Sequence, residues 1–513
     1  MIHVGGKPLL TEDFEKVIFE NEAIDLHPDA LQKVKVNYEF LQHYSKDKII
    51  YGINTGLGPM AQYKVSESEQ LELQFNLIRS HSSGSGNHFP EELSRATMLA
   101  RLNSLMQAAS GIHPEVVELL KQLLNSKISA RIFERGGVGA SGDLVQLAHL
   151  ALNLIGEGEV LYNGQLLPAP QVFHEQNIKP LTIHLREGLA LMNGTSAMTG
   201  VGIVNLIHAK KAFHTSLALS SITNEIMESF DDHFSFELNH VKHHEGQSKV
   251  AEGIRTLLAD SQLVRKRPDH LYHRKVEENI FIDKVQEYYS LRCVPQILGP
   301  VYDTLVQAEK ILISEVNSAN DNPVVDHVNE NVYHGGNFHG DYVSLEMDKL
   351  KIVITKLCML SERQLNYLLN DKLNKKLPPF INLGKLGLNF GMQGMQFTAT
   401  STTAENQTLS YPMYLHSIPN NNDNQDIVSM GCNAALMTRR VIDNTFDVLA
   451  IQTISLMQAI DYLQCQSRLS SFTYSLYTDI RKLLPVFVED QPRYKDLQVI
   501  KQYLVNRKNA LAL

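Results

Sequence analysis

Cysteine is scarce in this sequence, and positive charge is not in excess. The four cysteines, Cys293, Cys358, Cys432 and Cys465, are far apart and match no zinc-binding spacing. The net charge is −9 and no basic tail or cluster is present, which argues against nucleic acid as a partner. We therefore expect a reduced, cytoplasmic protein without a metal site.

Signals for secretion and for membrane insertion are also missing. Met1–Leu10 lacks the charged-then-apolar pattern of a secretory signal. The longest stretch without a charge, Gly188–Ala209, contains Asn193, Thr195, Asn205 and four glycines. Such a composition predicts a buried functional segment and no membrane span.

Alternating strand patterns are rare, whereas long helical patterns dominate the second half of the chain. Apolar residues recur at helical spacing over Ser344–Asn374, Ala435–Leu463 and Ile203–Phe230. We predict an all-α protein in two parts, a mainly helical N-terminal domain over 1–200 and a long central helix bundle with C-terminal helices over 201–513. A narrow bundle exposes apolar surface, so we expect a homo-oligomer.

Local signals in the N-terminal part predict shorter elements. Ser66-x-x-Glu69 is a capping box that opens a helix, with Leu71, Phe75 and Ile78 on one face. Further helices are expected at Glu115–Leu124 and Leu144–Ile155, and a small hairpin around Asn163-Gly164.

The stretch Gly136–Asp143 stands out because three glycines surround the tripeptide Ala140-Ser141-Gly142. Glycine permits bends that other residues disfavour, and Asp143 then lies in the first turn of a helix. In such a bend the amide nitrogen of Gly142 can attack the carbonyl of Ala140. Loss of water from that adduct and from the Ser141 side chain leaves an electrophilic five-membered ring with an exocyclic methylidene.

Three other interpretations of this stretch exist. Gly137-x-Gly139-x-x-Gly142 fits the dinucleotide fingerprint, but that fingerprint needs a preceding strand, and Lys127–Gly136 is charged and broken. A nucleophile elbow needs glycine where Asp143 stands. A plain glycine turn before a helix stays open at this point.

Polar and aromatic clusters interrupt the apolar pattern elsewhere. Singly, each is more often a satisfied loop than a site. Together they contain what deamination of an amino acid needs, namely phenols to move protons, a guanidinium to hold a carboxylate, and amides to orient the rest. The clusters are Tyr51–Gly56, Arg79–His81, Met192–Thr195, Gln286–Arg292, Gly336–Gly340, Ala404–Asn406 and Asn421–Asp426.

Ordered motifs between about residues 50 and 470 resemble the aromatic amino acid and histidine ammonia-lyase family, in particular bacterial tyrosine ammonia-lyases. The resemblance implies the cofactor 4-methylidene-imidazol-5-one (MIO), formed from Ala140, Ser141 and Gly142, with no metal and no nucleotide. It also implies a fumarase/aspartase-like helical homotetramer in which each active site is lined by three chains. The motifs are Tyr51–Gly58, Ser80–Gly84, Gly139–His149, Asn193–Thr195, Tyr289–Arg292, Asp321–Pro323 and Asn424–Asp426.

The resemblance also implies residue roles. The substrate amine adds to the methylidene carbon derived from Ser141, Tyr51 takes the β-proton, and Arg292 holds the carboxylate. Asn193 and Tyr289 match residues that hold the cofactor carbonyl and assist proton movement. The residues expected to contact substrate are Gly58, Ser80, His81, Gln286, Arg292, Asn322, Phe338, Glu405, Asn421, Asn424 and Gln425.

The resemblance favours tyrosine as substrate, with trans-p-coumarate as product, over phenylalanine, with histidine third. The pair Ser80-His81 resembles histidine ammonia-lyases, and some tyrosine enzymes share it. Histidine ammonia-lyases carry Glu at the position of Gln425, where a carboxylate can pair with imidazole, and here a neutral amide replaces it. His81 can hydrogen-bond a phenol, and a site built for a hydroxyl rejects analogues without one. Histidine ammonia-lyase (histidine to urocanate) and tyrosine 2,3-aminomutase stay open as alternatives.

More distant alternatives are a fumarase-like lyase without the cofactor, which would tolerate Ser141→Ala, and a non-catalytic scaffold. His240, His243 and His244 suggest a metal at first sight. A loop of this kind beside Lys242 and Glu245 is more often a solvated surface, and we expect no ion there.

Overall fold

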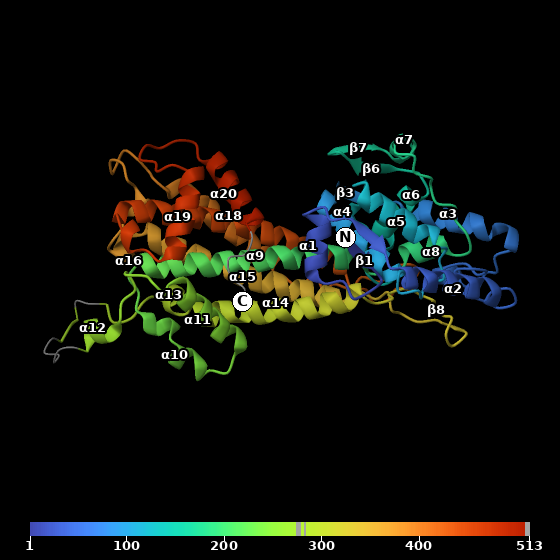
Figure 1. Ribbon diagram of the computed structural model, residues 1–513, viewed down its shortest axis with the longest axis horizontal. Coiled ribbons are helices and arrows are strands. Elements are labelled where there is room, and N and C mark those ends of the chain that lie inside the picture. The colour runs from blue at the N-terminus through green and yellow to red at the C-terminus, as the bar shows by residue number, and fades with distance from the viewer. Residues whose placement is uncertain (273–278, 282–283, 508–513) are drawn as a thin grey trace. The chain divides into compact units, whose positions relative to one another are not determined.

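The computed structural model describes residues 1–272, 279–281 and 284–507. It confirms the predicted all-α class, because helices dominate and the strands are short (Figure 1). Within the described part of the chain, every helix is too short or too polar for a membrane span.

The chain forms two compact units. The first contains Met1–Ile207, Ala308–Asp348 and Pro412–Arg439, and the second contains His208–Gln307, Lys349–Tyr411 and Arg440–Leu513. These units differ from the sequential segments 1–200 and 201–513, because two later stretches of chain pack with the first unit. Four long helices have residues in both units: α9 (Ser196–Ile226), α14 (Val294–Val316), α15 (Asp341–Leu369) and α18 (Gly431–Leu463).

The first unit combines short helices with small sheets. Its helices are α1 (Thr11–Ile18), α2 (Pro28–Tyr44), α3 (Gln70–His81), α4 (Glu91–Leu105), α5 (Glu115–Asn125), α6 (Leu144–Leu154), α7 (Ala169–Glu175) and α8 (Glu187–Met192). Its strands are β1 (Ile2–Val4), β2 (Ile24–Leu26), β3 (Ser85–His88), β4 (Ser129–Ala130), β5 (Phe133–Arg135), β6 (Glu159–Tyr162), β7 (Gln165–Pro168), β8 (Val324–Asp326) and β9 (Asn331–Tyr333).

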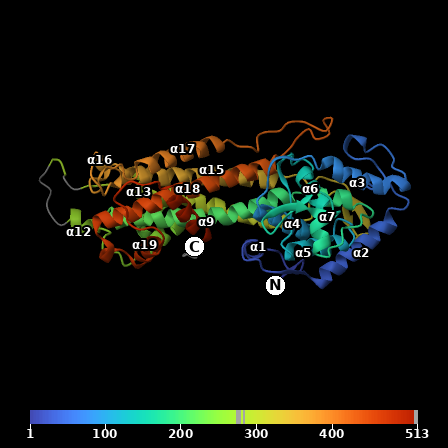
Figure 2. The same cartoon turned by 90° about the horizontal axis from the view of Figure 1, so that it is seen from above.

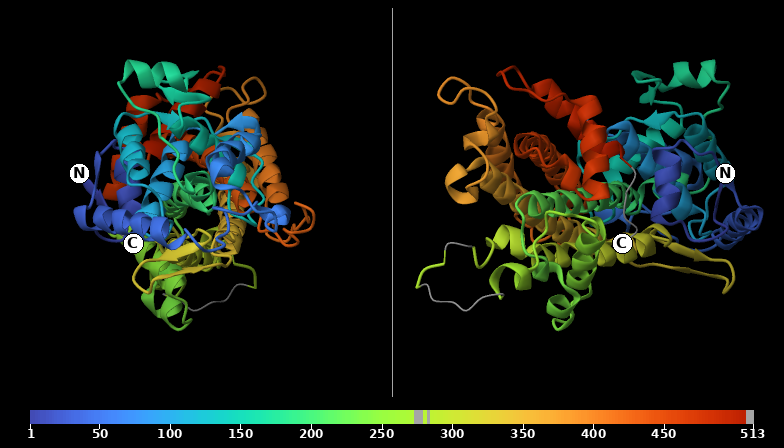
Figure 3. Two further views of the ribbon diagram at one scale, coloured as in Figure 1. Left: turned by 90° about the vertical axis from the view of Figure 1, so that its right-hand side faces the viewer. Right: turned by 60° about the vertical axis from the view of Figure 1, so that its left-hand side comes forward.

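Strand pairing in this unit is antiparallel except for β1 with β2. Strands β6 and β7 form the hairpin predicted around Asn163-Gly164, and α7 follows it directly (Figure 1). The pair of β8 and β9, yellow in Figure 3, precedes α15 in the chain.

The second unit is helical in its described residues. Its own helices are α10 (Phe236–His240), α11 (Glu245–Leu257), α12 (Arg267–Leu271), α13 (Tyr289–Arg292), α16 (Asp371–Asn374), α17 (Gln393–Leu409), α19 (Ser471–Leu483) and α20 (Tyr494–Asn506). Helix α17 lies along α15, where the Thr355 hydroxyl donates to the Asn406 carbonyl at 3.3 Å (Figure 2).

Hydrogen bonds between side chains hold the long helices together inside the second unit. The Gln364 side chain bridges Ser220 of α9 and Gln452 of α18, with donor–acceptor distances of 2.8–3.1 Å. All three side chains are fully buried, so these bonds satisfy polar groups that burial would otherwise penalise.

Two local predictions are corrected by the structure. The capping box at Ser66 and Glu69 is present and Ile78 is buried, but Leu71 is 48% exposed, and α3 buries Gln74 and Leu77 beside Ile78. A strand, β5, does precede the Gly136–Asp143 loop. It spans three residues and pairs antiparallel with β3, so a parallel dinucleotide-binding βαβ unit is still excluded.

Candidate active site

The Ala140-Ser141-Gly142 tripeptide lies in a bend that only glycine can form at two positions. Gly139 has φ +78° and Gly142 has φ +71°. A Cβ on Gly142 would lie 2.0 Å from the Gly194 carbonyl oxygen, and one on Gly139 would lie 2.0 Å from Ser429 Oγ. Both the backbone conformation and the close approach therefore require glycine.

Main-chain contacts hold both ends of this bend. On one side, the Gly139 carbonyl accepts hydrogen bonds from the Ser429 hydroxyl at 3.0 Å and from the Gly340 amide at 3.1 Å. On the other side, the Asp143 amide donates to the Gly194 carbonyl at 2.8 Å. The tripeptide is thus fixed between three segments that are distant in the sequence.

Two amide side chains reach Ser141 itself. Asn193 Nδ2 donates to the Ser141 carbonyl at 3.1 Å, and Gln425 Nε2 donates to Ser141 Oγ at 2.9 Å. Asn193 is oriented in turn by the Asn322 amide, which donates to Asn193 Oδ1 at 3.0 Å. These contacts place hydrogen-bond donors at two oxygens of the central residue.

Ser141 opens into a pocket of about 950 Å³ in the first unit. Most of the predicted site residues line it: Tyr51, Gly58, Ser80, His81, Ser141, Asn193, Asn322, Phe338, Asn421, Asn424 and Gln425. Leu57, Leu73, Leu77, Leu144 and Leu189 add an apolar wall. Among the described residues that line this pocket, none is Asp, Glu, Lys or Arg, so it suits a neutral aromatic ring.

His81 Nδ1 lies 3.0 Å from the Leu77 carbonyl oxygen and 3.0 Å from Ser80 Oγ. A carbonyl oxygen can only accept, so a hydrogen bond to Leu77 requires the tautomer with the proton on Nδ1. In the neutral ring Nε2 is then an acceptor. Near Ser141, the Tyr51 phenol oxygen accepts a hydrogen bond from the Gly58 amide at 2.9 Å.

Asp143 differs from its expected role. It precedes α6, but its carboxylate accepts from the Met198 amide at 2.7 Å and so caps the start of α9. The side chain is completely buried, and this burial raises its pKa from an ordinary value of 3.8 to about 7.

Further buried polar residues, which the sequence analysis did not select, hold the Asn193–Thr195 segment. Arg101 donates to the Asn193 carbonyl at 2.9 Å and also to the Ala190 carbonyl, and burial lowers its pKa to about 10. The Thr195 hydroxyl donates to the Glu315 carboxylate, whose pKa burial raises. Arg101 could have been found from the sequence, because a charged residue inside the apolar pattern of α4 indicates a buried polar contact.

The remaining predicted residues lie in the second unit. Gln286, Tyr289 and Arg292 line a pocket of about 710 Å³ there. The Arg292 guanidinium lies 4.4 Å from the Tyr289 ring centroid, and its Nη1 donates to the Glu287 carbonyl at 2.6 Å. Glu405 of α17 forms an ion pair with Arg440 at 2.5 Å. The lining of the Ser141 pocket includes none of these four described residues.

The helical fold and the fixed Ala-Ser-Gly bend beside a pocket are the features that the sequence motifs predict for a helical amino acid lyase. Residues 9–482 match the family described as aromatic amino acid lyase. A tyrosine 2,3-aminomutase from Chondromyces crocatus is 38% identical over 508 residues, which cover 98% of this chain and 96% of that protein. A histidine ammonia-lyase from Geobacillus sp. (strain WCH70) is 37% identical over 505 residues, with coverages of 98% and 96%.

The fold agrees with these sequence matches. The crystal structure of a tyrosine aminomutase from Streptomyces globisporus gives a TM-score of 0.94 at 36% identity, covering 98% of this chain and 96% of that one. The chain therefore belongs to the aromatic amino acid lyase family, as its motifs predict.

The raised pKa of Asp143 predicts a pH dependence of stability. The unfolded chain loses this proton near pH 4 and the folded chain near pH 7, so unfolding releases a proton between these values. The free energy of unfolding attributable to Asp143 then decreases as pH rises through this window. In Asp143→Asn the decrease should be smaller than in the unsubstituted protein.

Urea unfolding midpoints measured at about pH 5 and about pH 7.5 check this expectation. Glu72→Gln is the control, since Glu72 lies exposed on α3. An Asp143→Asn variant whose midpoint falls with pH as steeply as that of the Glu72→Gln control would contradict the assignment.

Proposed function

We propose that the protein is an ammonia-lyase that converts L-tyrosine to trans-p-coumarate, using an MIO group formed from Ala140, Ser141 and Gly142. The observation that carries the proposal is the Ser141 pocket, which joins an apolar wall to His81 with Nε2 available as an acceptor. A tyrosine hydroxyl can donate to that nitrogen, whereas phenylalanine leaves it without a partner.

The residues at the bend fit the MIO group. Gly142 has no Cβ to obstruct its amide nitrogen, and the main chain on both sides of the tripeptide is fixed. Asn193 donates to the Ser141 carbonyl oxygen, which is the position where the ring carries its oxygen. When present, the group supplies an electrophile for the substrate amine and so improves a poor leaving group.

Residues of the chain then handle the substrate. Tyr51 is the group we propose to take the β-proton, and the Gly58 amide that donates to its oxygen stabilises negative charge there. Phe338 and the leucines exclude water from the ring region. Ser80, Asn322, Asn421 and Asn424 add neutral polar side chains to the lining of the pocket.

The substrate carboxylate needs a cation that the described lining of the Ser141 pocket does not contain. We propose that Arg292, Tyr289 and Gln286 of a neighbouring chain provide this side of the site, and Glu405 of a third chain the region of the amine. Tyr289 is 71% exposed in the single chain, as expected for a residue that completes another chain's site. The large exposed side chains Phe390, Phe397, Tyr411, Leu415, Ile418 and Ile427 support burial in a homotetramer.

A second candidate is a tyrosine 2,3-aminomutase, which returns ammonia to the β-carbon after the same elimination. The identity of 38% to an enzyme of that name favours it. Histidine is the third candidate substrate. Gln425 is a neutral amide that donates a hydrogen bond to Ser141 Oγ, so it offers no negative charge to pair with an imidazole. We also propose a cytoplasmic location, since all four cysteines are free.

Purified protein incubated with L-tyrosine should release p-coumarate, detected by its absorbance and by chromatography. In His81→Phe the ratio of kcat/KM for tyrosine over phenylalanine should fall by at least about 100-fold, because the acceptor for the hydroxyl is gone. His174→Phe, at an exposed position of α7, is the control. Urocanate formation at a higher kcat/KM than p-coumarate formation would overturn the substrate, and β-tyrosine as the main product would select the aminomutase.

If each active site contains residues of more than one chain, two inactive variants should regain activity when they form mixed oligomers. Tyr51→Phe and Arg292→Ala should each be inactive, whereas oligomers assembled from a 1:1 mixture should regain up to about a quarter of the sites. The control is a mixture of Tyr51→Phe with Ser141→Ala, because both residues line the same pocket of one chain. Mixed Tyr51→Phe and Arg292→Ala oligomers without activity would show that Arg292 serves its own chain.

A further inference from the structure

Three potential metal ligands meet in the first unit, at a place that the proposed reaction does not use. His113 lies just before α5, Glu115 is the first residue of α5, and His184 lies shortly before α8. Their donor atoms all lie within 4.8 Å of one another. Glu115 Oε2 is 3.8 Å from His113 Nδ1 and 4.0 Å from His184 Nε2.

The two imidazoles are suited to act as ligands. His184 Nε2 is buried and makes no hydrogen bond within the described residues. The Glu115 amide donates to His113 Nδ1 at 3.3 Å, so this nitrogen is an unprotonated acceptor, and a bound cation would replace that hydrogen bond. An unprotonated imidazole nitrogen is the form that binds transition metals.

Surrounding residues hold the two histidines in place. One carboxylate oxygen of Glu187 accepts from the His113 amide at 3.0 Å and the other from the His184 amide at 2.7 Å. The Tyr38 ring packs edge-on against both imidazoles, with centroid distances of 5.1 Å and 6.2 Å. These contacts hold the two histidines beside Glu115.

We propose that His113 Nδ1, the Glu115 carboxylate and His184 Nε2 bind one zinc-type divalent cation per chain. Two imidazoles and one carboxylate form a donor set typical of zinc, with the fourth position left to water. Ligands at about 2.0 Å from a tetrahedral ion lie about 3.3 Å apart, so each donor moves by less than about 1 Å on binding. The partial positive charge at the start of α5 disfavours a cation there, and the carboxylates of Glu115 and Glu187 offset this charge.

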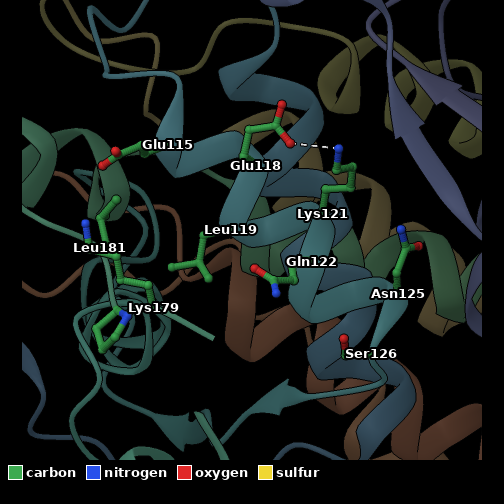
Figure 4. A pocket seen from close by; sticks show the side chains of 10 residues that line it. Glu115, Glu118, Leu119, Lys121, Gln122, Asn125, Ser126, Lys179 and Leu181 are labelled. Atoms are coloured by element: carbon green, nitrogen blue, oxygen red, sulfur yellow. Dashed lines mark ion pairs between the residues drawn. The ribbon is translucent and has the colours of Figure 1, made fainter. Parts of the chain in front are cut away.

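The cluster has a path to solvent. Glu115 also lines a pocket of about 500 Å³, together with Glu118, Lys121, Lys179 and Leu181 (Figure 4). Lys121 forms an ion pair with Glu118, drawn as a dashed line in Figure 4, and is thereby partly neutralised. The side chains of His113, Glu115 and His184 are themselves 29%, 53% and 34% exposed, so an ion can reach the cluster from solvent.

The position of the cluster suggests what the ion does. Helix α8 begins at Glu187, soon after His184, and leads directly into Asn193 and Gly194, which contact the Ala-Ser-Gly bend. An ion that ties His184 to the start of α5 restricts the segment entering α8. We expect it to stabilise the folded first unit without touching substrate.

Binding can be measured on the full chain, without a histidine tag and after removal of metal with a chelator. Titration with Co²⁺ should give the visible absorption of a tetrahedral site, saturating at one equivalent per chain, and calorimetry with Zn²⁺ should give the same stoichiometry. Mg²⁺ should not compete, because hard cations prefer oxygen ligands. The thermal midpoint should rise with the concentration of free Zn²⁺, and should go on rising logarithmically above the Kd.

Variants separate this site from chance binding. His113→Ala combined with His184→Ala should abolish the Co²⁺ signal, and Glu115→Gln, at a side chain that is 53% exposed, should weaken binding at least about tenfold. His243→Ala is the control, since His240, His243 and His244 lie exposed and the described residues show no metal-like cluster there. Retention of the signal in both Glu115→Gln and the double variant, or its loss in His243→Ala, would overturn the proposal.

Discussion

The structure around the proposed reaction depends on one close approach, that of Gly142 to the Gly194 carbonyl. With 2.0 Å between that oxygen and any Cβ, the contact exists only because residue 142 has no side chain. The approach brings the segment after α8 against the bend before α6, and the Asp143 amide completes it. Asn193, one residue before Gly194, thereby reaches the Ser141 carbonyl. The positions of the groups around Ser141 thus follow from the packing of two main-chain segments, the bend before α6 and the segment after α8.

Buried charges maintain this arrangement. Arg101, Asp143 and Glu315 lie deep in the first unit, where burial disfavours their charged forms. Each is compensated by hydrogen bonds to main chain or side chain around Asn193–Thr195 and the start of α9. An apolar core of similar volume would lack such directional contacts, and so would orient Asn193 less strictly.

Much of the fold could be predicted because long helices have a strong apolar period. The hairpin at Asn163-Gly164 was predictable because its turn residues favour one conformation. Errors arose where local pattern competes with tertiary packing. Leu71 has the spacing of a core residue but lies at the exposed start of α3, and β5 is a three-residue strand with no alternation to detect.

The motifs predicted the residues of the candidate site better than they predicted which of these residues lie together. Tyr51, His81, Ser141 and Gln425 do share one pocket, as the motifs indicate. Arg292 and Tyr289 line a different pocket, in the second unit. Motifs did not reveal this separation, because they identify residue types and not where the fold places them. The pairing of His113 with His184 escaped notice for a related reason, since only folding brings these distant positions together.

Intact-mass measurement of the purified, active protein tests the central claim most directly. Condensation of Ala140-Ser141-Gly142 removes two waters, so the mass should be about 36 Da below that calculated from the sequence, with the deficit confined to the peptide that contains Ser141. An active preparation with the full calculated mass and an unmodified Ser141 peptide would contradict the account.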